Sequence, residues 1–215
     1  MIARASLLLV ALLGHDDQGR DRYKNPKDLD GCIASMDEPG RAAWQKPDQV
    51  LDALALQPGQ VVCDIGAGTG YFSLRAAQRI GDKGRVFAVD VEPKILDVLR
   101  VRIEKTGVRN VTPVLAVAAD PLLPPRSCDL VLIVDAYHHF PDRPRYLTRL
   151  AALLRPGGRL VNVDWHKQRS GNFGPPSEHR IAREDFLADA AKAGLRLVAE
   201  PKFLQYQYFL VLAPR

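Results

Sequence analysis

Two acidic side chains and three glycines stand where a ligand that carries a ribose would need them. Gly66, Gly68 and Gly70 alternate with other residues directly after a short apolar run that ends in Asp64. Glycine permits positive φ angles and lets a ligand approach the backbone closely. A second acid, Asp90, ends the next apolar run, where a carboxylate can accept hydrogen bonds from ribose hydroxyls. These residues predict a nucleoside-containing ligand between two neighbouring strands.

The glycine spacing distinguishes two kinds of cofactor. A dinucleotide fingerprint, G-x-G-x-x-G, would place its third glycine at position 71, where this chain has Tyr71. The stretch from 64 to 70 reads D-x-G-x-G-x-G instead, and it resembles the first motif of the class I S-adenosylmethionine-dependent methyltransferases. The resemblance implies that this motif binds S-adenosylmethionine through Asp64, Gly66, Ala67, Gly68 and Gly70.

The same resemblance implies further contacts to the nucleoside part of the cofactor. Asp90 and Val91, at the end of the second strand, are expected at the ribose. A third strand, expected over residues 112–117, leads into Asp120, where the resembled family commonly has an acid that reaches the adenine amino group. The alternative is that the Asp120 carboxylate only caps the turn before Pro121.

The acceptor side of the site is expected just past the fourth strand. Residues 128–135 form a near-continuous aliphatic run that ends in Asp135, and ligands collect at the carboxyl ends of strands in open α/β sheets. The segment that follows resembles the acid-x-x-His-His segment of small-molecule methyltransferases of the ubiquinone-biosynthesis type. We expect Asp135 to contact the cofactor, and Tyr137 and His138 to face the transferred methyl group.

His138 is the candidate general base for a hydroxyl acceptor, because a histidine with a pKa of about 6.5 is largely neutral at pH 7. The alternative is that His138 packs beneath the loop. Adjacent residues on a turn are expected to point in different directions, so one of His138 and His139 is expected to be structural. Spacing places no third ligand beside them, and no metal site is expected.

Charge and cysteine content argue against several other classes. The formal net charge is +5 and the pI about 9.2, but the basic residues form no long run, so no nucleic-acid partner is expected. Cys32, Cys63 and Cys128 are odd in number and lack C-x-x-C spacing, which indicates neither a disulfide framework nor a zinc site. Cys63 and Cys128 are therefore expected to be small core residues.

The first fourteen residues contain an apolar segment that is too short to span a bilayer as a helix. The segment resembles the apolar centre of an export signal, yet no small-x-small cleavage site follows it. The competing interpretation is a helix that lies on the domain or on a partner. We expect a cytoplasmic protein without a stable membrane span, because the cofactor is made in the cytoplasm; export or membrane association through residues 1–14 is the alternative.

Residues 1–46 are expected to form an N-terminal arm or cap, and residues 47–215 the methyltransferase domain. In the resembled family the region before the first strand folds over the cofactor and shapes the substrate pocket. By that analogy four side chains are candidates for the pocket wall: Tyr23, Arg41, Trp44 and Gln45. The alternative is that the aromatic residues only hold a surface arm in place.

Strand and helix patterns alternate along residues 47–194, and two strands joined by a short connection follow. Alternation predicts an α/β, doubly wound, Rossmann-like sheet, and the short connection makes the last two strands antiparallel. The resemblance implies a seven-stranded sheet in the order 3-2-1-4-5-7-6, with strand 7 antiparallel. The sequence does not specify an oligomeric state.

The resemblance implies transfer of a methyl group from S-adenosylmethionine to a small-molecule acceptor. The acceptor atom is not identified by any residue. Two alternatives keep the cofactor site: a protein that binds the cofactor without turnover, and another transferase, such as an aminopropyl transferase, on the same scaffold. A nicotinamide-dependent oxidoreductase is a third alternative, which the glycine spacing disfavours.

Overall fold

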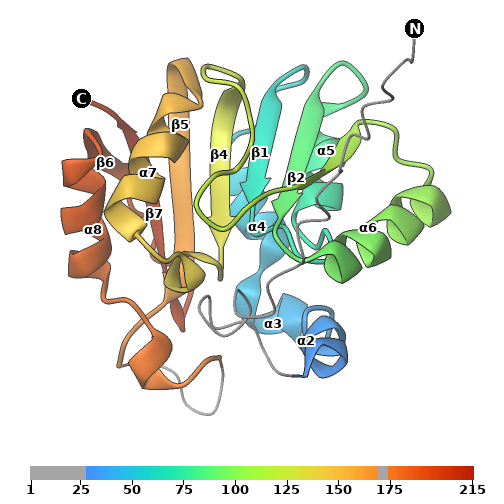
Figure 1. Ribbon diagram of the computed structural model, residues 1–215, viewed down its shortest axis with the longest axis horizontal. Coiled ribbons are helices and arrows are strands. Elements are labelled where there is room, and N and C mark those ends of the chain that lie inside the picture. The colour runs from blue at the N-terminus through green and yellow to red at the C-terminus, as the bar shows by residue number, and fades with distance from the viewer. Residues whose placement is uncertain (1–27, 169–173) are drawn as a thin grey trace, which may run out of the picture.

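The computed structural model describes residues 28–168 and 174–215. The expectations for residues 1–14 and for Tyr23 lie outside these residues. The described chain contains a seven-stranded sheet in the order β3-β2-β1-β4-β5-β7-β6 (Figure 1). Its strands are β1 Val61–Ile65, β2 Arg85–Asp90, β3 Val111–Leu115, β4 Cys128–Val134, β5 Leu154–Trp165, β6 Leu195–Ala199 and β7 Gln207–Pro214.

Strands β1 to β5 are parallel, while β7 pairs antiparallel with both β5 and β6. The expected doubly wound sheet, its strand order and its antiparallel strand 7 are confirmed. Two expected strand ranges differ slightly from the structure. The third strand, expected over residues 112–117, is Val111–Leu115, and the fourth, expected over residues 128–135, ends at Val134.

Helices cover both faces of the sheet, as Figure 1 shows with α7 and α8 in front and α4 and α5 behind. The helices are α2 Leu29–Ser35, α3 Arg41–Gln45, α4 Pro47–Ala53, α5 Ser73–Ile80, α6 Pro93–Thr106, α7 Arg143–Ala152 and α8 Arg183–Lys192, and the 3-10 turns are η1 Tyr137–His139 and η2 Ser177–His179. None of the helices within the described residues is long and apolar enough to cross a membrane.

Two hydrophobic clusters, one on each face of the sheet, use alternate residues of the same strands. Leu130 and Leu132 of β4 pack in the cluster that includes α4, α5 and α6, while Val131 and Ile133 pack in the cluster that includes α7 and α8. All four side chains are at most 1% exposed. A strand covered on both faces requires a continuous aliphatic run, which explains the sequence of β4.

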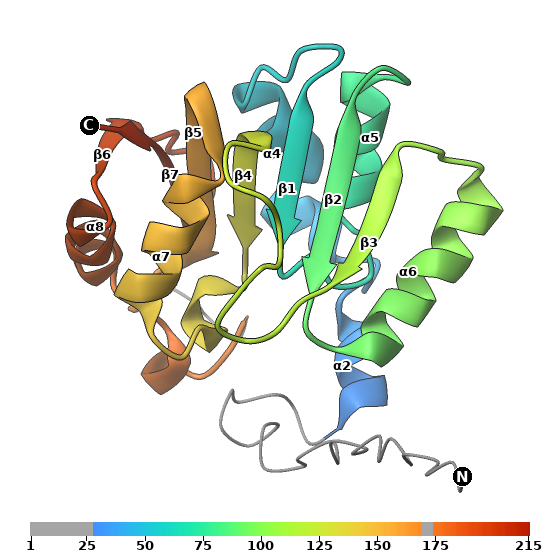
Figure 2. The same cartoon turned by 45° about the horizontal axis from the view of Figure 1, so that its top comes forward.

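The parallel strands all place their carboxyl ends at one edge of the sheet. In Figures 1 and 2 this edge faces the first helix of the described chain, α2, and in Figure 1 also α3. The residues that follow β1, β2 and β4 therefore meet at the edge that faces α2 and α3. This arrangement brings Asp64, Asp90 and Asp135 together although they are far apart in the sequence.

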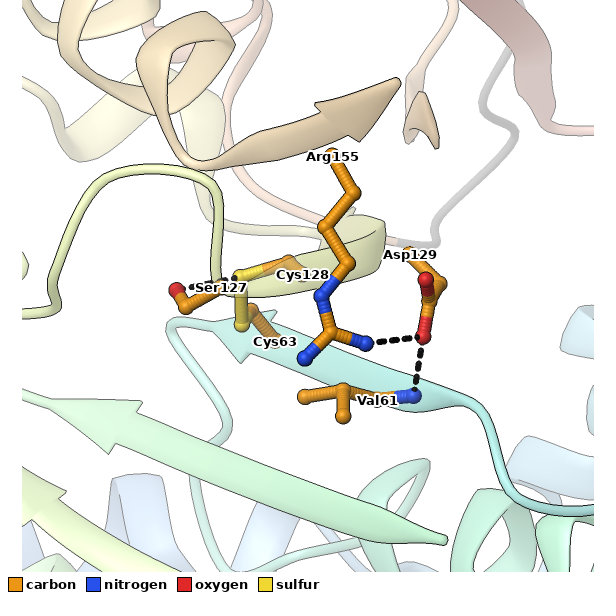
Figure 3. The surroundings of a disulfide bond; sticks show 6 residues. All are labelled: Val61, Cys63, Ser127, Cys128, Asp129 and Arg155. Atoms are coloured by element: carbon orange, nitrogen blue, oxygen red, sulfur yellow. Dashed lines mark hydrogen bonds and ion pairs between the residues drawn. A yellow bond between two sulfur atoms is a disulfide. The ribbon is translucent and has the colours of Figure 1, made fainter. Parts of the chain in front are cut away.

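A disulfide joins Cys63 of β1 to Cys128 of β4, with the two Cα atoms 5.9 Å apart (Figure 3). Both cysteines are fully buried. The expectation that they are separate core residues without a disulfide is wrong. The pairing is not visible in the spacing because the two residues are 65 positions apart and become neighbours only when β1 and β4 pair. Cys32 is a free cysteine.

Candidate functional site

Two adjoining cavities lie at the carboxyl ends of β1, β2 and β4. The smaller has a volume of about 150 Å³ and the larger about 650 Å³. Residues that line both cavities come from the glycine loop, the end of β4 and helix α2: Cys32, Met36, Gly66, Gly68, Asp135 and His139. The shared wall places the two cavities side by side.

The glycine loop between β1 and α5 has the positive φ angles that its sequence predicts. Gly66, Gly68 and Gly70 have φ values of 75°, 57° and 87°. A Cβ atom on Gly66 would lie 2.4 Å from the Cβ atom of Ala136, so this position has no room for a side chain. Gly70 lines neither cavity, and a Cβ atom there would lie 2.4 Å from Leu99 Cδ1. Gly66 and Gly68 therefore form the cavity wall, while Gly70 allows α6 to pack closely.

Asp90 lies at the end of β2 and lines the smaller cavity together with Val91. Its Oδ2 atom accepts a hydrogen bond from the backbone N–H of Gly68 at 3.0 Å, and its Oδ1 atom accepts one from Glu92 at 3.0 Å. Burial raises the pKa of Asp90, while these backbone donors oppose the rise. The carboxylate thus links the glycine loop to the start of α6.

Asp64 is buried under the glycine loop and lines the larger cavity. Ser73, at the first turn of α5, donates its hydroxyl to Asp64 Oδ2 at 2.6 Å. Burial raises the pKa of Asp64 to about 6, against the opposing effect of the Ser73 hydrogen bond. Ala67 lines the same cavity.

Asp135 follows β4 with a φ angle of 54°, which is uncommon for a residue other than glycine. Gln45 donates to its Oδ2 atom at 2.7 Å, and Gln207 donates to its Oδ1 atom. Burial raises the pKa of Asp135 to about 6; nearby Arg41 opposes the rise and Asp164 adds to it. Gln45 and Arg41 belong to α3, Gln207 to β7 and Asp164 to β5. Asp135 therefore links α3 to the strands beyond β4.

His138 lines the larger cavity and is backed by a buried carboxylate. Its Nδ1 atom lies 3.2 Å from Asp164 Oδ1, and Asp164 is fully buried at the carboxyl end of β5. His139 also lines this cavity, and the two imidazole centroids are 4.2 Å apart. The 3-10 turn η1 brings both rings to the same wall, so the expectation that they point in different directions is wrong. His138 is buried against Asp164 while His139 is exposed, and the expectation that one of them is structural stays a prediction.

Tyr137 and Asp120 do not lie where the sequence analysis placed them. Tyr137 is fully buried, lines neither cavity and donates its hydroxyl to Asp189 Oδ2 at 2.8 Å, so the expectation that it faces the methyl group is wrong. Asp120 also lines neither cavity. Its carboxylate accepts from Arg149 at 2.5 Å and from the backbone N–H of Leu122 at 2.9 Å. Asp120 therefore caps the turn, as the alternative interpretation states.

Residues 37–45, which precede α4, contact the glycine loop and the ends of β4 and β5. Asp37 accepts a hydrogen bond from the Thr69 hydroxyl at 2.7 Å and two from Arg102 of α6, both at 2.7 Å. Trp44 packs against Trp165 at the end of β5 with a centroid distance of 4.9 Å. Arg41 and Trp44 line the larger cavity, and Gln45 is buried on Asp135.

Sequence reasoning missed Asp164 and Gln207 as parts of the site. Asp164 had a usable signal, because it follows an aliphatic run near the carboxyl end of a parallel strand, at the same edge of the sheet as Asp90 and Asp135. Gln207 had none, since its role depends on the antiparallel pairing of β7 with β5. Among the described residues, no group of three or more His, Cys, Asp or Glu side chains is arranged to hold a metal ion.

Comparison with protein families gives an independent result. Residues 62–158, which run from β1 into the first half of β5, match a family model described as "Methyltransferase domain". The matched range contains Asp64, the glycine loop, Asp90, Asp135 and His138.

Curated relatives match the same part of the chain. The ubiquinone/menaquinone biosynthesis C-methyltransferase of Vibrio vulnificus is 31% identical over 118 residues, which is 54% of this chain and 45% of the relative. The nocamycin O-methyltransferase of Saccharothrix syringae is 33% identical over 112 residues, which is 52% of this chain and 40% of the relative. The chain therefore matches less than half the length of these relatives.

Among solved structures, a crystal structure of an S-adenosylmethionine-dependent methyltransferase from Aquifex aeolicus is similar over most of the chain. The TM-score is 0.80 at 24% identity, and the match covers 85% of this chain and 96% of that one. At this identity the likeness shows a shared fold.

Proposed function

We propose that this chain, which carries a class I S-adenosylmethionine-dependent methyltransferase domain, transfers a methyl group to a small-molecule acceptor. The single observation that carries the proposal is the pair of adjoining cavities with the glycine loop and Asp135 in their shared wall. The larger cavity, at about 650 Å³, falls within the range of about 300–1,000 Å³ typical of small-molecule sites.

The residues present fit the cofactor that the family implies. Gly66 presents backbone without a side chain to the cavity, and the Asp90 carboxylate at the end of β2 is placed to accept hydrogen bonds from ribose hydroxyls. Ala116 and Ala118 give the smaller cavity small apolar side chains where an adenine ring needs space. Val91 would contact the ribose in the same wall. Asp64 and Asp135 place acidic groups beside the loop for a positively charged ligand.

When bound, S-adenosylmethionine supplies a methyl group that is already activated by the positive charge of its sulfonium. The protein's own task is then to hold the acceptor in line with that group and to exclude water. The buried walls of the larger cavity support this task through the packed pair Trp44 and Trp165.

His138 is the proposed general base for a hydroxyl acceptor. Asp164 lies 3.2 Å from its Nδ1 atom and holds the imidazole in the wall of the larger cavity, and we propose that the imidazole takes the proton of the acceptor through Nε2. The negative charge of Asp164 also stabilises the protonated imidazole that results. A thiolate or a stabilised carbanion would need no such base, and for them His138 would act only in positioning.

Two other functions retain the same cofactor site. A binding protein without turnover would bind the cofactor but transfer no methyl group, and the buried pairing of His138 with Asp164 favours an enzyme over it. An aminopropyl transferase would need several acids for a polyamine. The larger cavity has Glu38 in addition to Asp64 and Asp135, but Arg41 lies among them and opposes a polycationic ligand.

The test is a thermal-shift panel with S-adenosylmethionine, S-adenosylhomocysteine, NAD and NADP. A ligand at 100 times its dissociation constant stabilises the folded state by about 2.7 kcal/mol. We expect the first two compounds to raise the melting temperature and the nicotinamide cofactors to leave it unchanged. A rise with NAD alone would contradict the proposal. Methyl transfer to a panel of hydroxylated small molecules then separates an enzyme from a binding protein.

The domain division and the cellular location belong to the same proposal. We place residues 1–46 as a cap and residues 47–215 as the methyltransferase domain, supported by the contacts of Asp37 and Gln45 with the site. We place the protein in the cytoplasm, where the methyl donor is made. The disulfide between Cys63 and Cys128 is the observation against this location, because disulfides are rare in cytosolic proteins.

A further inference from the structure

Asp37, in the turn between α2 and α3, joins two separate parts of the cofactor site. Its Oδ2 atom accepts a hydrogen bond from the hydroxyl of Thr69 in the glycine loop. Each of its two carboxylate oxygens also accepts one from the guanidinium of Arg102 in α6. All three bonds are 2.7 Å long. Paired N–H···O bonds of this kind fix the geometry of both partners.

The charge of Asp37 serves this junction and not a ligand. Partial burial works to raise the pKa of its carboxyl, but the hydrogen bonds from Arg102 and Thr69 outweigh that effect and lower the pKa below its usual value. The carboxylate is therefore ionised at neutral pH, as the pairing requires. Asp37 is not among the described residues that line either cavity. Its contacts hold protein to protein.

Helix α2, which leads into Asp37, has few other attachments. None of its seven residues is buried against the described part of the chain. Leu29, Cys32 and Met36 follow one another at spacings of three and four residues, so they share one side of the helix, and all three line the smaller cavity. A segment with so few buried apolar contacts opens locally at a low cost in free energy.

A ligand in the smaller cavity would give α2 the contacts that it lacks. Gly66 and Gly68 line this cavity opposite the side chains of α2, and a Cβ atom on Gly68 would lie 3.1 Å from Met36 Sδ. A cofactor in the cavity would cover the apolar surface of Leu29, Cys32 and Met36. Its binding would therefore favour the position that α2 occupies here, because a ligand stabilises the state to which it binds better.

The same part of the chain also forms a wall of the larger cavity. Glu38, Arg41 and Trp44 line that cavity, and Trp44 packs on Trp165 with a centroid distance of 4.9 Å. The larger cavity has this wall only while residues 28–46 lie against the sheet edge. A contact that holds these residues in place therefore acts on both cavities.

We propose that Asp37 is the latch that keeps residues 28–46 closed over the bound cofactor, through Thr69 and Arg102. The inference rests on the proposed function, because it requires that the chain binds S-adenosylmethionine. Asp37 is a positioning residue in this account. Without the latch the open state becomes more populated, so the cofactor product S-adenosylhomocysteine dissociates faster, while its entry is not slowed.

The two tryptophans of the chain supply the signal for the experiment, because Trp44 lies in the latched segment and Trp165 at the end of β5. Stopped-flow fluorescence at increasing concentrations of S-adenosylhomocysteine gives the association and dissociation rate constants. Arg102→Gln should raise the dissociation rate about 10- to 100-fold, the usual effect of losing hydrogen bonds to a charged group, and leave the association rate unchanged or higher. Arg102→Lys, which keeps the charge but not the paired bonds, should fall between this variant and the parent.

Thr69→Val is an independent variant, because it removes the second partner of Asp37 and keeps the shape of the side chain. It should also raise the dissociation rate, by less than Arg102→Gln. Arg100→Gln is the matched control in the same helix, since Arg100 is half exposed and pairs with Asp97. Its rate constants should equal those of the parent.

Hydrogen exchange separates a latch from general damage. In Arg102→Gln the amides of residues 28–46 should exchange faster than in the parent, and those of β1 and β4 at the same rate. Saturating S-adenosylhomocysteine should slow exchange of residues 28–46 in the parent. An unchanged dissociation rate in Arg102→Gln and Thr69→Val, or faster exchange in residues 28–46 and the sheet alike, would overturn the inference and leave the proposed function intact. If the parent does not bind S-adenosylhomocysteine in calorimetry, the proposed function itself fails.

Discussion

At the scale of single residues, Asp90 has two tasks that a substitution can separate. We propose that its carboxylate binds the ribose, and it already accepts backbone hydrogen bonds from Gly68 and Glu92. Asp90→Ala should weaken S-adenosylhomocysteine by about 1.5–3 kcal/mol, because ribose hydroxyls lose a charged acceptor. It should also lower the melting temperature, because two backbone N–H groups lose their partner.

Asp90→Asn tests the two effects separately in calorimetry and thermal melts. The amide oxygen still accepts one of the two backbone hydrogen bonds while the amide NH2 faces the other N–H, so we expect part of the stability to return while cofactor affinity stays low. Asp97→Ala, at an exposed acid of α6 paired with Arg100, is the control that should change neither quantity. An Asp90→Ala protein that binds as tightly as the parent would remove the ribose assignment.

The proposed base gives the second prediction at this scale. His138→Ala should reduce methyl transfer to a hydroxyl acceptor by about 10²- to 10⁴-fold, the usual contribution of a general base, while affinity for S-adenosylhomocysteine is retained. Asp164→Asn should cause a smaller loss and lower the apparent pKa of the pH–rate profile, because the protonated imidazole loses its counter-charge 3.2 Å away.

His139→Ala provides the comparison, since this ring lies in the same cavity wall with its centroid 4.2 Å from that of His138. We expect a smaller loss of turnover than in His138→Ala when both are measured by transfer of a labelled methyl group. Equal activity in the two variants would exclude histidine as the base and leave alignment of the acceptor as the main contribution.

At the scale of elements, the sequence predicts the position of side chains that lie at the ends of strands. It does not predict the position of side chains that depend on how elements distant in the sequence pack together. Asp64, Asp90 and Asp135 each follow a short aliphatic run, and the rule for parallel sheets brings them to one edge. Tyr137 is two residues past Asp135, but its direction is set by packing on Phe186 and by Asp189 of α8. No local pattern contains that information, because α8 follows much later in the chain.

The disulfide between Cys63 and Cys128 could not be predicted from the sequence, because it depends on the pairing of β1 with β4. It leads to a prediction. Denatured, non-reduced protein should show one free thiol, Cys32, and three after reduction. The bond ties β1 to β4 across 65 residues, a loop for which the chain-entropy model gives about 4 kcal/mol. Cys63→Ala combined with Cys128→Ala should therefore lower the melting temperature markedly, since it also leaves a small cavity between the strands.

Cys32→Ala is the control for the disulfide and should leave stability almost unchanged, because this residue is only partly buried and unpaired. Since both bonded sulfurs are inaccessible to solvent, a reductant should act on the native protein only at the rate of unfolding. Three free thiols in protein isolated under alkylating conditions would show that the bond does not form in its own compartment, and would remove the observation against a cytoplasmic location.

At the scale of the whole molecule, the buried Asp64 and the partly buried Asp135 make folding stability depend on pH. Burial raises the pKa of both Asp64 and Asp135 to about 6, well above the value near 3.9 expected in an unfolded chain. Between these values the folded state binds more protons than the unfolded state, so the free energy of unfolding falls as pH rises. The stabilisation that the protonated Asp64 and Asp135 give the folded state is fully present below about pH 4 and is lost by about pH 6 to 7.

We therefore expect urea denaturation to show that the free energy of unfolding falls between pH 4.5 and 7, by on the order of a few kcal/mol from these two groups. Replacing both acids with Asn should flatten the dependence, because the amides carry no titrating proton. Asp48→Asn, at a carboxyl whose side chain is 70% exposed, should leave the slope unchanged. S-adenosylmethionine, whose positive charges favour the ionised acids, should stabilise the protein more at pH 7 than at pH 5. A slope equal in the parent and the double variant would mean that neither acid is protonated in the folded protein.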